Sequence, residues 1–210
     1  MKIKSLGYLS FNMSFDNVEV FTDPLSLDEV GLKLPKTKAD VVLHTNTVTD
    51  EQLLNVEQKI VPAKKEEVLH IRTPGEYELG GLMVRRNIKD NFYILDEDFL
   101  RVLYVGSLPK DTKSEVFKDL GDVEVLVIPV GDGESFPEFS VIEKIISIVD
   151  PLLLIPSGFR TSSMKSGKDL KAVDDFVKQS GYANVRREKS VSISGAPEKE
   201  VRKMDVVILE

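Results

Sequence analysis

Short runs of apolar, mostly β-branched residues alternate with turn residues along most of this chain. Such runs predict β-strands, because branched and aromatic side chains fit the half-buried surface of a pleated sheet. Between them, Gly, Pro, Asn and Asp supply turn chemistry, and Pro74-Gly75 suits a type II turn. The predicted strands cover residues 3–8, 18–21, 41–43, 68–71, 82–84, 92–95, 100–105, 123–130, 152–155, 191–193 and 206–209.

Helical periodicity is confined to four segments. The clearest covers residues 138–149, where apolar residues recur every three or four positions and Pro151 follows the end. A short helix is predicted to begin at Thr49, and others cover residues 112–120 and 168–180. The last two are each followed by a glycine, which suits a helix C-terminus.

The order of these elements indicates a layered fold. The first hundred residues are mostly hairpin-like strands, whereas strands and helices alternate afterwards. Many strands with helices between them predict two packed sheets that helices cover on the outside. Because no linker rich in Pro, Gly or Ser divides the chain, we expect a single domain over residues 1–210.

The composition excludes several classes of function. The 210 residues include no cysteine and two histidines, His44 and His70. This excludes a disulfide scaffold, a Cys-ligated metal site, a thiol nucleophile and a multi-histidine centre. The net charge of −7 argues against nucleic-acid binding. No apolar run approaches the roughly 20 residues of a membrane span, and the N-terminus has no signal-peptide core. We therefore expect a cytoplasmic protein with neither a nucleic-acid nor a membrane partner.

Four of the predicted strands end in short polar loops. In layered α/β folds, ligands bind where the carboxyl ends of strands converge, so these loops would form the site if they meet. The loops are His44-Thr45-Asn46, Gly106-Ser107, Gly131-Asp132-Gly133 and Pro156-Ser157-Gly158.

Five segments, in this order and spacing, resemble one known family. They are residues 1–7 with Gly7, Thr22-Asp23-Pro24, residues 39–43, the Pro-Gly-Glu-Tyr-Glu stretch within residues 73–81, and the Gly-Asp-Val strand of residues 121–131. The chain is similar in them, end to end, to the metallo-β-lactamase-fold hydrolases, in particular the small bacterial branch like the ascorbate-phosphate lactonases. The resemblance implies an α+β fold: a four-layer αββα sandwich of two mixed β-sheets with outer helices.

The resemblance also implies where a metal would bind. Members of the family carry a His-x-His-x-Asp-His loop, further histidines and a bridging aspartate, which hold zinc or manganese and activate water. The matching positions here are occupied by Asn46, Val48, Asp50 and Glu51, by Ser107 for the bridging aspartate, by Gly158 for a later histidine, and by Tyr8 after the first glycine. Asn and Ser are weak zinc ligands and Val is none. We therefore predict no catalytic residue, no metal ligand and no cofactor. The alternative is a weakly bound divalent cation on Asp50 and Glu51.

A residual pocket is still expected where the strand ends converge. It would be lined by Tyr8, Asn46, Asp50, Glu51, Ser107, Asp132 and Gly158. The segment of residues 157–168 carries several hydroxyls and three cations directly before a predicted helix, whose first backbone N–H groups attract anions. We predict an anion site at Arg160, Lys165 and Lys168, with a small anionic ligand as partner. The alternative is an ordinary polar loop.

Two functions from different classes follow. The first is a non-catalytic relative of the metallo-hydrolases that serves as a binding or assembly module. The second is a hydrolase of a small substrate, for example a phosphorylated one, with an atypical or weakly bound metal. A nucleophilic triad is disfavoured because the sequence contains no Gly-x-Ser-x-Gly motif. We interpret His44 and His70 as core or edge histidines. A homo-oligomer stays an open alternative.

Overall fold

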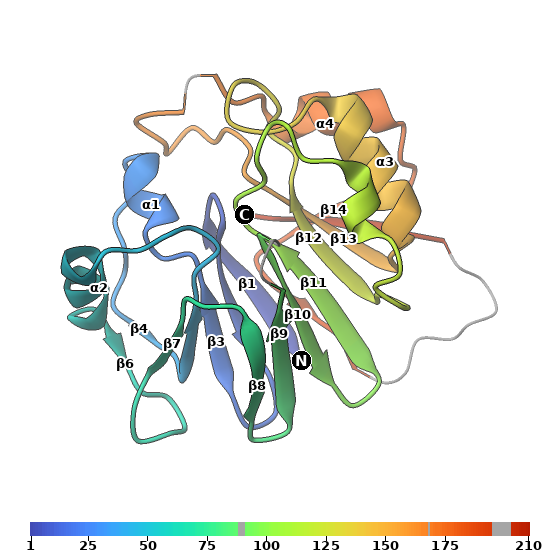
Figure 1. The fold of residues 1–210 in the computed structure, drawn as a ribbon. Coiled ribbons are helices and arrows are strands. Elements are labelled where there is room, and N and C mark those ends of the chain that lie inside the picture. The colour runs from blue at the N-terminus through green and yellow to red at the C-terminus, as the bar shows by residue number, and fades with distance from the viewer. Residues whose placement is uncertain (88–90, 168, 195–202) are drawn as a thin grey trace.

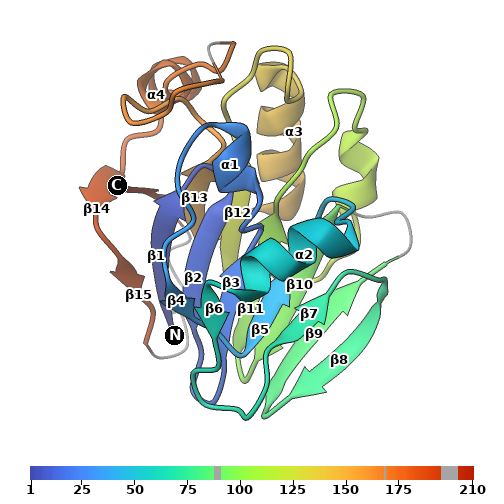
Figure 2. The same ribbon diagram turned by 90° about the vertical axis from the view of Figure 1, so that its left-hand side faces the viewer.

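Two β-sheets face each other in this protein, and helices lie on their outer sides (Figures 1 and 2). The computed structural model describes residues 1–87, 91–167, 169–194 and 203–210. Within them, the first sheet has six strands in the order β15-β1-β2-β3-β5-β7. Its strands are β1 (Lys2–Gly7), β2 (Ser10–Ser14), β3 (Glu19–Thr22), β5 (Val41–Leu43), β7 (Leu69–Ile71) and β15 (Val191–Ser192). The short strands β4 (Thr37–Lys38) and β6 (Ile60–Val61) pair separately.

The second sheet has eight described strands in the order β14-β16-β13-β12-β11-β10-β9-β8. They are β8 (Gly75–Leu79), β9 (Leu82–Arg86), β10 (Phe92–Glu97), β11 (Leu100–Val105), β12 (Val125–Pro129), β13 (Leu153–Ser157), β14 (Val185–Glu188) and β16 (Asp205–Leu209). β11, β12, β13 and β16 run parallel. Their carboxyl ends therefore lie at one edge, at the top of Figure 1.

The helices cover the outer faces of the two sheets. α1 (Ser26–Glu29) and α2 (Asp50–Glu57) lie beside the first sheet, and α3 (Phe139–Val149), α4 (Val173–Ser180) and the 3₁₀ turn η1 (Ser114–Phe117) lie beside the second (Figure 1). Three buried apolar clusters fill the spaces between these layers: one between the sheets, one under α3 and α4, and one under α1 and α2. This arrangement confirms the predicted αββα sandwich. None of the described helices combines the length and apolar character that a bilayer-spanning segment requires.

Two predicted helices are shorter than expected. α4 begins at Val173 because the chain before it is held extended: Arg160 N–H donates to Lys171 O, and Lys171 N–H donates to Gly131 O. Lys168, where we predicted this helix to start, lies outside the described residues. The helix predicted over residues 112–120 is the single turn η1, which has Phe117 as its one large buried side chain.

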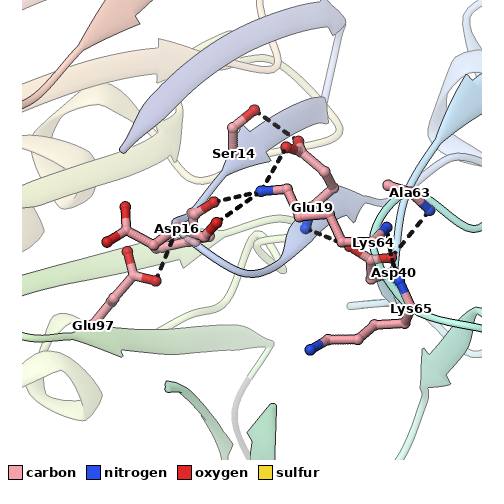
Figure 3. Close-up of polar contacts among 9 residues, drawn as sticks. Ser14, Asp16, Glu19, Asp40, Ala63, Lys64, Lys65 and Glu97 are labelled. Carbon is pink, nitrogen blue, oxygen red and sulfur yellow. Dashed lines mark hydrogen bonds and ion pairs between the residues drawn. The ribbon is translucent and has the colours of Figure 1, made fainter. Parts of the chain in front are cut away.

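At the end of the first sheet opposite the predicted site, a buried carboxylate, Asp40, joins β3 to the segment of residues 63–65 (Figure 3). Its Oδ1 accepts backbone N–H groups of residues 63–65 at 2.6–3.0 Å, and its Oδ2 accepts the N–H of Glu19 at 2.9 Å. Burial opposes ionisation, but these four donors lower the pKa of Asp40 below its ordinary value of 3.8. Lys64 adds two side-chain contacts here: its ammonium donates to the carbonyl oxygen of Asp16 and forms an ion pair with Glu19.

Candidate binding site at the carboxyl ends of the strands

The ends of β5 and β11 meet. Ser107 N–H donates to Thr45 Oγ1 at 2.9 Å. Gly106 packs so closely here that a Cβ on it would lie 2.2 Å from Asp23 Oδ2 and 2.4 Å from Thr45 Oγ1. Because real Cβ atoms do not approach that closely, only glycine fits at this position.

The ends of β12 and β13 meet the turn between β1 and β2. Gly158 N–H donates to Tyr8 O at 3.1 Å, and a Cβ on Gly131 would lie 2.1 Å from Gly158 O. Gly158 has a φ of +62°, and a Cβ on it would lie 2.7 Å from Pro129. The position that corresponds to a family histidine therefore has no space for a side chain.

The remaining predicted pocket residues lie apart from these contacts. Asp50 is almost fully exposed and pairs with Arg72 at 3.2 Å, and Asn46 and Glu51 are also exposed. Asp132 accepts the N–H of Gly133 and pairs with Lys171. Burial opposes ionisation of Asp132, but the hydrogen bond from Lys171 lowers its pKa. That these residues share one pocket stays a prediction.

A buried polar network joins the two sheets at this edge. Asp23 accepts Thr45 N–H on Oδ1 at 2.7 Å, and its Oδ2 lies 2.6 Å from both Thr45 Oγ1 and the hydroxyl of Tyr104. Tyr104 also lies 2.7 Å from the carbonyl oxygen of Leu9. Complete burial raises the pKa of Asp23 above its ordinary value of 3.8, although the hydrogen bonds from Thr45 and Tyr104 oppose that shift.

The backbone at the end of β5 is held by a cation from the second sheet. Arg86 Nη1 donates to His44 O at 2.7 Å, and its Nη2 donates to Thr45 O at 3.1 Å. The same guanidinium lies 5.3 Å from the ring centroid of Tyr93, whose hydroxyl lies 2.9 Å from His44 O and 3.0 Å from Ile71 O and can donate its proton to either. A positive charge therefore lies against the loop on which the family places its metal ligands.

The two histidines form a pair beneath that loop. His44 Nε2 lies 3.1 Å from His70 Nδ1, and the rings stack at 5.4 Å. His44 is 1% exposed. Burial, followed by the neighbouring His70 and the two arginines Arg72 and Arg86, lowers the pKa of His44 to about 3. Burial also lowers the pKa of His70. Both are therefore neutral imidazoles at neutral pH, in line with the interpretation as core or edge histidines.

This pair predicts a simple titration. Because the chain has two histidines, we expect NMR to show two ring signals, with the His44 signal constant between about pH 8 and about pH 5. Below pH 6.5, histidines in the unfolded chain bind protons, whereas His44 in the folded protein stays neutral. The free energy of unfolding should therefore decrease as the pH is lowered, by up to about 1.4 kcal/mol per pH unit for each such histidine. His44→Gln assigns the signals. A His44 midpoint near 6.5 would contradict the prediction.

The residues at this edge do not fit the metal centre that the resemblance implies. Across the parts of the chain that the structure describes, no group of three or more His, Cys, Asp or Glu side chains is arranged to hold a metal ion. Asp50 is paired with Arg72, Gly158 has no side chain, and Arg86 directs its charge at the loop. A zinc or manganese ion needs three or four donors that face one point, and this donor set does not supply them.

A cavity of about 640 Å³ lies beside these strand ends. It is bounded by the turn between β1 and β2, the end of β13 with the segment after it, the start of α4, and the last residues of the chain. Of the predicted site residues, Tyr8 and Arg160 line it. Lys165 is exposed and does not line it, and Lys168 lies outside the described residues.

Several residues of this edge were not among the predicted site residues, although Asp23 and Ser157 lie in segments that the sequence singled out. Asp23, Arg86, Tyr93 and Tyr104 make the polar network, and Ser157 and Arg187 line the cavity. One signal was available: a charged residue directly after or within an apolar strand, as with Asp23 and Arg86, has to find partners if it is buried.

Comparisons with known proteins agree with this architecture. A structure from Thermotoga maritima, a candidate zinc-dependent hydrolase of the metallo-β-lactamase superfamily, is 20% identical with a TM-score of 0.75, covering 100% of this chain and 98% of that one. Igni18, a metallo hydrolase from Ignicoccus hospitalis, is 15% identical with a TM-score of 0.58, covering 92% and 99%. YhfI, a metallo-β-lactamase-fold protein from Bacillus subtilis, is 10% identical with a TM-score of 0.58, covering 100% and 96%.

The sequence comparisons give the family. A search of curated proteins finds none that matches this chain. The beta-lactamase superfamily domain, by contrast, matches residues 2–157, which is most of the chain and includes β1 through β13. This protein therefore belongs to the family of beta-lactamase superfamily domains.

Proposed function

We propose that this metallo-β-lactamase-fold protein is non-catalytic and acts in the cytoplasm as a binding or assembly module. Its proposed ligand is a small anion. The donor set at the strand ends carries the proposal. Where the family has metal ligands, this chain has an exposed amide, an apolar side chain, a paired carboxylate and a glycine with no space around it.

The surrounding contacts support this proposal. In a metal-dependent hydrolase, the groups at this edge face the ion that activates water. Here Asp23 faces Thr45 and Tyr104, and Arg86 faces the carbonyl oxygens of His44 and Thr45. These groups use their hydrogen-bonding capacity on one another. They therefore hold the sheets together and do not present ligand atoms to a metal ion.

Metal analysis tests the proposal. We expect protein purified without chelator to contain no stoichiometric zinc, manganese or iron, and to hydrolyse neither a phosphate monoester nor a lactone after these metals are added. The control is Asp50→Ala, which removes the one retained family ligand and should change neither result. Stoichiometric metal that is lost in Asp50→Ala would overturn the proposal and favour the hydrolase.

A further inference from the structure

Among the described residues that line the cavity beside the strand ends, one cation has no ion-pair partner. Arg160 lines the cavity and is partly exposed. Within the described residues, its guanidinium makes no ion pair, and its Nη1 is shielded from solvent with no hydrogen-bond partner. A buried donor of a charged group that lacks a partner costs free energy, so such groups in native proteins call for an explanation.

The backbone around Arg160 is firmly placed. Its backbone N–H donates to Lys171 O at 2.9 Å, and its backbone forms an isolated parallel β-bridge with that of Ala172. Just before it, Gly158 is bonded to the turn at Tyr8. Arg160 therefore lines the cavity from a segment whose backbone is held by hydrogen bonds. Figure 2 shows β1, β14 and α4, which contribute lining residues, together at the left of the view.

Another part of the lining holds a second arginine and two acids, whose charges sum to −1. Arg187 pairs with both Asp174 and Glu210, and all three line the cavity. Among these four described lining residues, Arg160 is the one without an ion-pair partner, whereas Arg187, Asp174 and Glu210 form a group of net charge −1. A ligand with one negative charge can pair with Arg160, whereas a second negative charge would be repelled by that group.

The rest of the lining is a mixture of hydroxyls and apolar side chains. Ser157 is 1% exposed, and its Oγ has no hydrogen-bond partner in the described structure. Thr161 and Ser163 contribute further hydroxyls next to Arg160. Apolar surface comes from Leu6, Phe11, Leu32, Phe159, Val173 and Leu209. Hydroxyl donors suit carboxylate oxygens, and the apolar walls suit a hydrocarbon body.

We infer that this cavity binds a small organic monocarboxylate, with its carboxylate on Arg160 and its apolar body against Leu32 and Phe159. The guanidinium offers two parallel N–H donors, which match the two oxygens of a carboxylate. A cavity of about 640 Å³ is large enough for an aromatic or short-chain acid. This inference rests on the proposed binding function and names its ligand class and its site.

Calorimetric titration with phenylacetate tests the inference. We expect wild-type protein to bind phenylacetate, to bind the neutral amide phenylacetamide at least about tenfold more weakly, and to bind phenyl phosphate more weakly than phenylacetate. Arg160→Met should weaken phenylacetate binding by at least about tenfold. Lys165→Met removes a cation of the same segment that does not line the cavity, and should leave binding unchanged.

Thermal unfolding separates a ligand site from a structural role. Because Arg160 has no ion pair among the described residues, Arg160→Met should keep or raise the melting temperature of the ligand-free protein. A clear drop would show that Arg160 supports the fold, and would overturn the inference. Equal phenylacetate binding by wild type and Arg160→Met, tighter binding of phenyl phosphate, or no binding by metal-free wild type would overturn it too. Stoichiometric metal would instead overturn the proposed function.

Discussion

Asp23→Ala is expected to lower the free energy of unfolding by about 4 kcal/mol. The change removes the acceptor for Thr45 N–H and the partner of the Tyr104 hydroxyl, both of which are buried. It also opens space between three strands that meet at Gly106. A buried donor without a partner and a new void each destabilise a folded protein.

Asp23→Asn is expected to lower the free energy of unfolding by much less, about 1 kcal/mol. The reason is the number of protons available for hydrogen bonds around the Tyr104 hydroxyl. Tyr104 has a single hydroxyl proton, yet it lies within hydrogen-bond distance of both Leu9 O and Asp23 Oδ2. Both contacts are satisfied when Asp23 carries a proton of its own, as its raised pKa favours. An asparagine NH₂ can replace that protonated oxygen as a donor to Tyr104.

Urea unfolding of the three proteins at neutral pH checks this order. An exposed acid on α1, Asp28, provides the control, and Asp28→Asn should leave stability within about 0.5 kcal/mol. Since the folded pKa of Asp23 is raised, its favourable contribution is complete below pH 3.8 and is lost as the pH rises through the folded value. Asp23→Asn should remove that decline. Equal losses in the Asn and Ala variants would mean that Asp23 is ionised.

The strands that could be predicted are the ones with continuous apolar runs. Those runs are buried on both faces or pack against a sheet, as β12 shows with five buried residues in succession. β8 and β14 were missed because they are edge strands with charged residues at alternate or adjacent positions. β2 was missed because Ser10, Asn12 and Ser14 interrupt its apolar residues.

The polar loops at the strand ends could be located from the sequence, but their contacts could not. The polar loops after β5, β11, β12 and β13 follow apolar strands, so their positions could be identified from the chain alone. The backbone partners, Leu9 O for Tyr104 and His44 O for Arg86, could not, because they are carbonyls 95 and 42 residues away, next to strands of the facing sheet. A carbonyl has no sequence signature. The residues that would contact it depend on how the two sheets align, which no local pattern encodes.

Arg86→Met is expected to lower the free energy of unfolding by about 3 kcal/mol. The methionine fills part of the space but leaves Thr45 O without this donor and removes one of the donors to His44 O. Arg86→Lys should recover less than half of the loss, because an ammonium cannot reach two carbonyl oxygens with a planar fork. Arg72→Met is the control, since Arg72 makes an exposed ion pair with Asp50 and should cost less than about 0.5 kcal/mol.

A double-mutant cycle with Tyr93→Phe shows whether Arg86 and Tyr93 act as one unit. Both donate to His44 O, and Arg86 also donates to the Tyr93 hydroxyl at 3.1 Å. Once Arg86 is gone, Tyr93 becomes the more important donor to that carbonyl. The loss from Tyr93→Phe should therefore differ between the two backgrounds by about 1 kcal/mol. Losses that simply add would mean that the two side chains stabilise the end of β5 independently. In that case Arg86 acts through its own bond to Thr45 O rather than through a shared network.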